Sequence, residues 1–401
     1  MAPVDTARAD ISAKIVVPSP ARWGTRRSLF TAPPYGGWVV EDVIGADARV
    51  SASAQLAAAV DAVRSYAPDA QHLEADGVTR ADVNRLAAAG VLSAGLVDDW
   101  SPGQTREVHE QLAGASGALW FVLTQHRSPA EAARTTENEA LGDRWATGLK
   151  SGAFLGAVAF AHLRRPGAPT VTATREGDGW LVSGRLDWIT SWGLADVLLL
   201  MAETPGGDVV QALLPASERA GLTISGELSL AAMQGTSTVG AVLDGLHVRD
   251  VEVARVLPKI EWLAADRLRT ANAPPAVFGL TRAALNALIA AAEQRQWSTA
   301  SDLATRWREQ FERVRARAYT LVDDIPTDEC VDERVALRAE ITKLAQDVTS
   351  ALITVQAGRA LLLSSPEQRW AREAMFALVQ AQTQVTREEL VASYLRESRS
   401  S

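Results

Sequence analysis

Residues 186–196 read LDWITSWGLAD, and this stretch says most about the fold. Apolar and polar side chains alternate as they do in a β-strand, which ends in two tryptophans, a threonine and a serine before a turn at Gly193. One interpretation is an ordinary hydrophobic strand that closes on a turn. The other is a platform for a flat aromatic ligand, because an indole offers a face for stacking and a hydroxyl can bond to a polar ring edge.

The strand belongs to a longer block of strand-like sequence. Residues 170–190 alternate on both sides of EGDG at 176–179, which is a hairpin turn signal. A second pair of apolar stretches, 196–204 and 208–215, is separated by Pro-Gly-Gly, and further strand-like stretches continue to about residue 255. The pattern predicts a compact all-β domain.

Helical spacing precedes this block. Residues 51–150 are rich in alanine, and Thr79 followed by Asp82 indicates a capped helix start. Gly90 can end that helix. The stretch GASGALWFVLTQH at 114–126 is apolar almost all round, which predicts one buried helix.

Helical spacing also follows the β block. From about residue 259, apolar residues recur every three or four positions in four amphipathic helices. The last of these helices starts at Ser365 and Pro366, a cap followed by proline at the first helical position. Four such helices pack mainly on one another as a bundle.

The predicted fold is therefore α+β, with helices, then a β-domain, then a helical bundle. Residues near the N-terminus mix Pro, Gly, Arg and Ser without a sustained period, as in a poorly ordered or loosely docked arm. The expected parts are an N-terminal arm at 1–50, a helical domain at 51–150, a central β-domain at 151–258 and a four-helix bundle at 259–401.

Composition narrows the class of protein. The 401 residues are 47% hydrophobic, and a net charge of −8 argues against a nucleic-acid surface. No apolar run approaches the roughly 18 residues of a membrane span. Cys330 is the only cysteine and the five histidines are scattered, which argues against a disulfide or a metal site. These features predict a soluble cytoplasmic enzyme with no membrane or nucleic-acid partner.

In this domain order, the opening stretch resembles a strand of the acyl-CoA dehydrogenase superfamily, written G-x-K-x-W/F-I-T-N-G-x-x-A-D. The likeness covers roughly residues 51–395 and implies that superfamily's fold. It also implies an FAD cofactor against Trp188, Ile189 and Thr190, with FMN as the alternative flavin. The matching residues are Gly184, Asp187, Trp188, Ile189, Thr190, Gly193, Ala195 and Asp196.

Three other segments carry the resemblance. GAFLGAVAFAHL, with Phe160, stands where the superfamily has a cofactor-contacting loop. Arg295 falls on the arginine, and Gln356 and Gly358 on the glutamine-glycine turn, that reach the FAD of a neighbouring subunit, which implies a homodimer or homotetramer. REAMFALVQAQT resembles R-D-A-x-x-x-x-I-Y-E-G-T, with Arg372 and Thr383 at the matching ends.

The departures concern the chemistry. Ala381 stands where the superfamily has its catalytic glutamate, and alanine cannot abstract a proton, so the catalytic residue is unknown. The alternative base position, at 269–272, has no carboxylate either. Glu388 and Glu389 lie a turn or two beyond Ala381 and read as solvated side chains.

The phosphate loop and the substrate contacts also differ. His162 to Pro166 replace a Gly-Ser-Asp, and Arg164 and Arg165 fit either a phosphate contact or a solvated pair. His126 and His162 are packing residues or proton donors in flavin–oxygen chemistry. The expected substrate contacts are Ser116, His162 and Trp192.

Three functions remain open. The first is a flavin-dependent oxidoreductase that acts on an acyl-thioester or related small molecule, CoA-bound or carrier-bound, with an electron-transfer flavoprotein as partner. The second is a two-component monooxygenase that takes reduced flavin from a reductase. The third is a redox-inactive relative that serves as a partner subunit. The substrate itself cannot be read from the residues.

Overall fold

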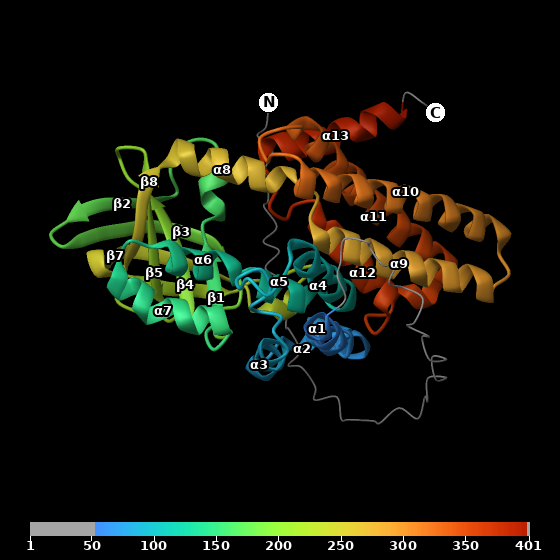
Figure 1. Cartoon of the computed structure of the whole chain (residues 1–401), viewed down its shortest axis with the longest axis horizontal. Coiled ribbons are helices and arrows are strands. Elements are labelled where there is room, and N and C mark those ends of the chain that lie inside the picture. The colour runs from blue at the N-terminus through green and yellow to red at the C-terminus, as the bar shows by residue number, and fades with distance from the viewer. Residues whose placement is uncertain (1–52, 399–401) are drawn as a thin grey trace, which may run out of the picture. The chain divides into compact units, whose positions relative to one another are not determined.

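The computed structural model of the chain describes residues 53–398 (Figure 1). The arm predicted at 1–50 lies outside the described residues. The described chain follows the predicted order of helices, strands and helices.

Within the described residues, seven α-helices come before the sheet: α1 Ala54–Arg64, α2 Ala70–Asp76, α3 Arg80–Ala88, α4 Pro102–Ala115, α5 Gly117–Thr124, α6 Arg127–Thr135 and α7 Glu139–Ser151. The predicted start of α3 is confirmed, because Thr79 and Asp82 form a reciprocal capping box. Gly90 has a φ of +79° just beyond the end of this helix, as a helix stop requires.

The buried helix predicted within 114–126 is confirmed as α5, but it begins after Ser116, and residues 114–115 belong to α4. The chain breaks at Ser116, whose extended backbone separates α4 from α5. The Ser116 hydroxyl accepts a hydrogen bond from the Leu119 N–H and so caps the new helix. In an almost uniformly apolar stretch, the spacing of apolar residues does not show where one helix ends and the next begins. The only sign of the break in the sequence is Ser116, a residue type that often caps a helix start.

In the part of the chain that the structure describes, eight strands form one mixed sheet: β1 Gly156–Ala159, β2 Val171–Glu176, β3 Gly179–Ile189, β4 Val197–Glu203, β5 Asp208–Pro215, β6 Leu222–Glu227, β7 Val239–Arg249 and β8 Val253–Pro258. Their order is β6-β7-β3-β2-β4-β5-β8, with β1 parallel to β4. Both predicted hairpins are confirmed: β2 pairs with β3 around EGDG, and β4 pairs with β5 around Pro-Gly-Gly.

The opening stretch forms the end of β3 and the turn after it. Ser191 has a φ of +69°, and its N–H donates to Thr236 O at 3.0 Å. The next N–H, of Trp192, donates to Ser237 O at 3.0 Å. The strand end is therefore tied to the short 3-10 helix η4 Gln234–Thr236.

Between the sheet and residue 398, where the described chain ends, there are six α-helices: α8 Lys259–Ala271, α9 Pro275–Gln294, α10 Ser298–Asp324, α11 Val331–Gln356, α12 Pro366–Ala377 and α13 Gln384–Ser398. The four predicted bundle helices are α9 to α12, and they share one hydrophobic core. The cap at Ser365 differs from the prediction, because its hydroxyl bonds to the Glu367 carboxylate and not to a backbone N–H.

Among the described residues, the segment Lys259–Gln294 is long and apolar enough, by length and composition, to cross a membrane. Within the fold, however, 67% of its apolar window is buried against other elements. Its central part crosses α4 very closely. A Cβ on Gly279 would lie 1.9 Å from Glu110 O, so only glycine allows this approach of α9 to α4.

Candidate functional site

The end of β3 presents its aromatic and hydroxyl groups in different directions. Trp188 is 49% exposed, while Ile189 is fully buried in the core. Thr190 is 4% exposed, and its hydroxyl lies 3.1 Å from the Thr238 hydroxyl. That hydroxyl in turn lies 2.8 Å from the Thr236 Oγ1, which donates to Met233 O.

An open groove of about 280 Å³ lies beside Trp188. It is lined by residues of β3, the β6 region and β7, namely Arg185, Leu186, Asp187, Trp188, Ser225, Leu228, Ser229, Leu230 and Gly240. Trp192, which we predicted as a substrate contact, is partly buried and packs against the core that includes Ile189. Of the two indoles, Trp188 is therefore the one that offers a face to a ligand.

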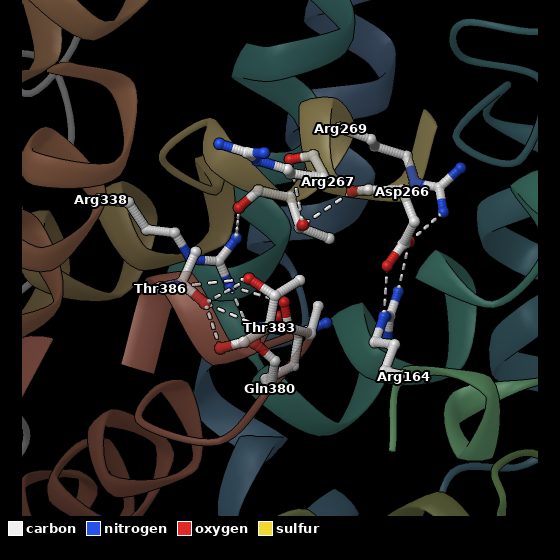
Figure 2. Close-up of polar contacts among 10 residues, drawn as sticks. Arg164, Asp266, Arg267, Arg269, Arg338, Gln380, Thr383 and Thr386 are labelled. Atoms are coloured by element: carbon white, nitrogen blue, oxygen red, sulfur yellow. Dashed lines mark hydrogen bonds and ion pairs between the residues drawn. The ribbon is translucent and has the colours of Figure 1, made fainter. Parts of the chain in front are cut away.

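The loop after β1 is held by a buried ion pair. Arg164 donates to both carboxylate oxygens of Asp266 on α8, at 2.7 and 2.8 Å, and Figure 2 shows Arg269 reaching the same carboxylate. Burial alone would raise the pKa of Asp266, but Arg164 and Arg269 hold it below its usual range. Phe160 lies in the same cluster, with its ring edge-to-face against Trp262 at 5.8 Å. Arg164 thus has a carboxylate partner, whereas Arg165 forms a half-exposed pair with Asp187 at 2.6 Å.

One arginine of α11 contacts both segments that the resemblance predicted as base positions, 269–272 and the turn at Ala381. Figure 2 shows the Arg338 guanidinium between the end of α8 and the turn after α12. Its Nη1 donates to Thr270 O at 2.7 Å, and its Nη2 donates to Gln380 O at 2.9 Å and to Ala381 O at 3.3 Å. Ala381 has a φ of +49° in this turn.

Arg338 is 4% exposed, and its guanidinium donates to backbone carbonyls. Burial, followed by repulsion from Arg164, lowers the pKa of Arg338 to about 10. The two segments that could have carried a catalytic carboxylate therefore meet at a buried cation. The carboxylates that the sequence places nearest, Glu388 and Glu389, instead pair with Gln384 and Arg396 on α13.

A small cavity of about 30 Å³ borders this turn, since Gln380 is one of the residues that line it. Its lining comes from α4, α5, α9, α12 and the η4 region: Ala113, Gly117, Trp120, Met233, Ala276, Val277, Leu280, Glu373, Phe376, Ala377 and Gln380. Most of these side chains are apolar. The charged residue of this lining is Glu373, which the sequence pattern alone did not predict as a site residue.

Glu373 belongs to a group of four charged residues, of which Glu74, Arg369 and Glu373 are buried. Its Oε1 lies 2.6 Å from Arg369 Nη1 and accepts the Gly117 N–H at 3.1 Å. Glu74 on α2 lies 3.2 Å from Arg372 Nη1. Burial raises the pKa of both carboxyl groups, and at Glu74 the charge of Glu373 raises it further. Glu373 is 3% exposed and Glu74 is 4% exposed.

The raised pKa of Glu373 predicts a pH-dependent stability difference. A carboxyl group whose pKa is higher in the folded state stabilises the fold fully below its unfolded pKa of about 4.3, and this contribution is lost as the pH rises through the folded pKa. Glu373→Gln removes the titration. The melting temperature of the variant minus that of the wild type should therefore increase between about pH 4 and pH 8. Calorimetry at each pH measures it, with the exposed Glu388→Gln as control, and a difference independent of pH would refute the assignment.

The other predicted residues lie apart from this region. Arg295 donates to the Gln356 side chain at 3.0 Å, so the structure brings these two together at the far end of α9, with Gly358 exposed nearby in sequence. His126 is buried, with one ring nitrogen against Leu149 O at 2.8 Å and the other accepting the Gly156 N–H. Both ring nitrogens of His126 are therefore engaged with the backbone, as in a structural residue of the core. His162 keeps a buried ring nitrogen without a hydrogen-bond partner among the described residues, and burial lowers its pKa to about 4.

Comparison with known proteins gives the fold. No family model matches the sequence. Butyryl-CoA dehydrogenase from Megasphaera elsdenii is 17% identical, with a TM-score of 0.71 over 86% of this chain and 99% of that one. Glutaryl-CoA dehydrogenase from Mycobacterium smegmatis is 20% identical, with a TM-score of 0.70 over 88% and 97%. The chain has the acyl-CoA dehydrogenase fold.

The acyl-CoA dehydrogenase fold is shared with an oxygenating enzyme. Dibenzothiophene monooxygenase from Paenibacillus sp. A11-2 is 17% identical, with a TM-score of 0.69 over 86% of this chain and 97% of that one. The similarity scores for the dehydrogenases and the monooxygenase are nearly equal. The fold prediction made from the sequence is confirmed, whereas the type of reaction has to be argued from the site.

The residues at the end of β3 fit one ring of a flavin. The groove beside Trp188 approaches the smallest usual ligand-pocket volume of about 300 Å³, and its exposed indole offers an apolar face. Ile189 has no exposed surface and so supports the strand from the core side. Arg295 follows the last residue of α9, a helix of 20 residues that is about 30 Å long. Arg295 and its partner Gln356 therefore lie at the opposite end of α9 from its first residue.

Proposed function

We propose that this chain is a flavin-dependent oxidoreductase whose flavin ring lies against Trp188. The observation that carries the proposal is the exposed indole at the end of β3, beside an open groove, in a chain with the acyl-CoA dehydrogenase fold. A bound flavin would supply two-electron transfer. FAD is the expected form, and FMN would serve the ring site equally.

Each residue of the site has a separate task in this proposal. The Trp188 indole stacks on the ring, and Thr190 lies inside the hydroxyl chain that fixes the strand end. Phe160, in the loop after β1, packs against Trp262 and borders the flavin site from that loop. Arg295, Gln356 and Gly358 serve a second subunit's cofactor, which makes the active assembly a homodimer or homotetramer.

The substrate site in this proposal is the cavity between the helices. Ala113 and Gly117 supply one wall, α9 supplies Ala276, Val277 and Leu280, and Phe376 closes the side toward α12. These side chains exclude water from the end of a small molecule that enters the cavity. An acyl group carried by CoA or by a carrier protein is the substrate class that the fold relatives favour, with an electron-transfer flavoprotein as electron acceptor.

Substitution of Trp188 tests the flavin site. Trp188→Ala should weaken FAD or FMN binding about tenfold, because the ring loses its stacking partner. Since the indole is 49% exposed, the free energy of unfolding without flavin should fall by less than about 1 kcal/mol. Visible absorbance and fluorescence titrations measure the affinity, and Tyr394→Ala on α13, an equally exposed aromatic, is the matched control.

Three results separate the open functions. A wild-type chain that stays colourless and takes up neither FAD nor FMN contradicts the oxidoreductase proposal and favours a partner subunit without redox chemistry. Bleaching of bound flavin by butyryl-CoA without oxygen favours a dehydrogenase. Oxygen uptake that depends on supplied reduced flavin favours a monooxygenase with a partner reductase.

The turn at Ala381 favours the monooxygenase as the second candidate. Neither Ala381 nor residues 269–272 supply a carboxylate, and Arg338 occupies the space behind both segments. Oxygen transfer from a reduced flavin does not require a protein base at this point, whereas α-proton abstraction does.

A further inference from the structure

One polar group of the cavity is not explained by the fold or by a flavin. Glu373 is 3% exposed and lines the cavity together with mostly apolar side chains. Its Oε1 receives hydrogen bonds from Arg369 and from the Gly117 N–H. Its Oε2 is buried and has no hydrogen-bond partner among the described residues.

A structural role accounts for Oε1 alone. Through that oxygen Glu373 joins α12 to the first residue of α5, and Gly117 leaves the room, since a Cβ there would lie 2.7 Å from Oε1. Burial of a carboxylate oxygen without a donor is costly, and most buried polar atoms in proteins have a partner. Oε2 is therefore a buried acceptor that lacks a donor among the described residues, in a residue that lines the cavity.

We propose that Glu373 recognises the buried end of the substrate, and that this end is small and carries an N–H or O–H donor. The inference rests on the proposed function in treating the cavity as part of the substrate site. A volume of about 30 Å³ admits a group of the size of one or two water molecules. A plain hydrocarbon end would fill this space but leave Oε2 without a donor.

The charges around Glu373 set how the site responds to pH. Glu74 faces it from α2, Arg369 and Arg372 face it from α12, and the N-terminus of α5 adds a positive dipole end. The cavity residues from α4 and α9 are uncharged. Because burial raises the pKa of Glu373, the carboxylate forms more fully at higher pH, and binding of a cationic donor should strengthen in that direction.

Three probes of two non-hydrogen atoms test the preference on the full chain without flavin. Methanol, methylammonium and ethane have similar size but differ in their donors. Ligand-observed NMR should show methanol and methylammonium binding about tenfold more tightly than ethane. The stronger of the two then identifies an alcohol or an amine as the substrate's buried end.

Two variants and one control complete the test. Glu373→Gln should weaken methylammonium binding about tenfold and leave ethane unchanged. Ala113→Val fills the cavity without replacing Glu373, so it should abolish binding of all three probes. Glu367→Gln, a buried glutamate of α12 that does not line the cavity, should have no effect.

Several results would overturn the proposal. They are equal binding of ethane and the donors to the wild type, an unchanged preference in Glu373→Gln, or binding that survives Ala113→Val. If Glu373→Gln does not fold, the proposal is still tested by the preference of the wild type for methanol and methylammonium over ethane, and by the loss of binding in Ala113→Val. Because no flavin is present, failure of the flavin proposal would leave these results intact. Conversely, a chain that takes up flavin but shows no donor preference contradicts only the role of Glu373.

Discussion

Replacement of Arg338 by methionine is expected to lower the free energy of unfolding by about 3–5 kcal/mol. Methionine has a similar length but no donor, so the carbonyls of Thr270, Gln380 and Ala381 would be left unpaired in the interior. The methionine cannot compensate as it can when a whole buried ion pair is replaced, because the backbone acceptors remain.

Arg338→Lys distinguishes charge from geometry. An ammonium group keeps the charge that the C-terminal carbonyls of α8 favour, but it cannot reach the end of α8 and the turn after α12 at once as the guanidinium does. The lysine variant should therefore lose about half as much stability as the methionine variant. Urea denaturation measures both. A methionine variant as stable as the wild type would mean that the cost of burying the cation outweighs its hydrogen bonds.

The sequence predicted the elements whose pattern has a clear period. The hairpins around EGDG and Pro-Gly-Gly, and the helices α9 to α12, follow from alternation or from three-to-four spacing. The break at Ser116 was missed because the residues on both sides of it are apolar, so burial on every side hides the change of helix. The position of the break between α4 and α5 therefore depends on tertiary packing.

The site was only partly predictable for a related reason. Trp188 was recognised from its place at the strand end, but alternation alone did not show that the indole is half exposed while Thr190 is buried. Glu373 stands four residues after Arg369, a spacing that is typical of an exposed helical ion pair. It is buried because α2 and α5, more than 250 positions earlier, cover this face of α12. No local pattern reports such a contact.

Replacement of Arg315 by methionine is also expected to cost about 3–5 kcal/mol, because it would leave the carboxylate of Glu110 buried with too few donors. Glu110 on α4 has no exposed surface, and Arg315 Nε on α10 donates to its oxygens at 2.9 and 3.2 Å. Burial by itself would lower the pKa of Arg315, but Glu110 raises it above its usual value. This pair joins α10 to α4, which also supplies Ala113 to the cavity.

Arg317, two residues further along α10, is the matched control. It makes a shorter two-fold contact with Glu333, at 2.6 and 2.7 Å, but its side chain is 44% exposed. Arg317→Met should therefore cost less than about 1 kcal/mol. Arg282 and Tyr319 also contact Glu110. Adding Glu110→Gln to Arg315→Met removes a buried charge that has lost one of its two arginine partners, and it should recover part of the lost stability. Denaturant titrations of the four proteins measure these differences. Equal losses for Arg315→Met and Arg317→Met would show that burial does not determine the strength of these contacts and that the α4–α10 pair does not hold the cavity wall.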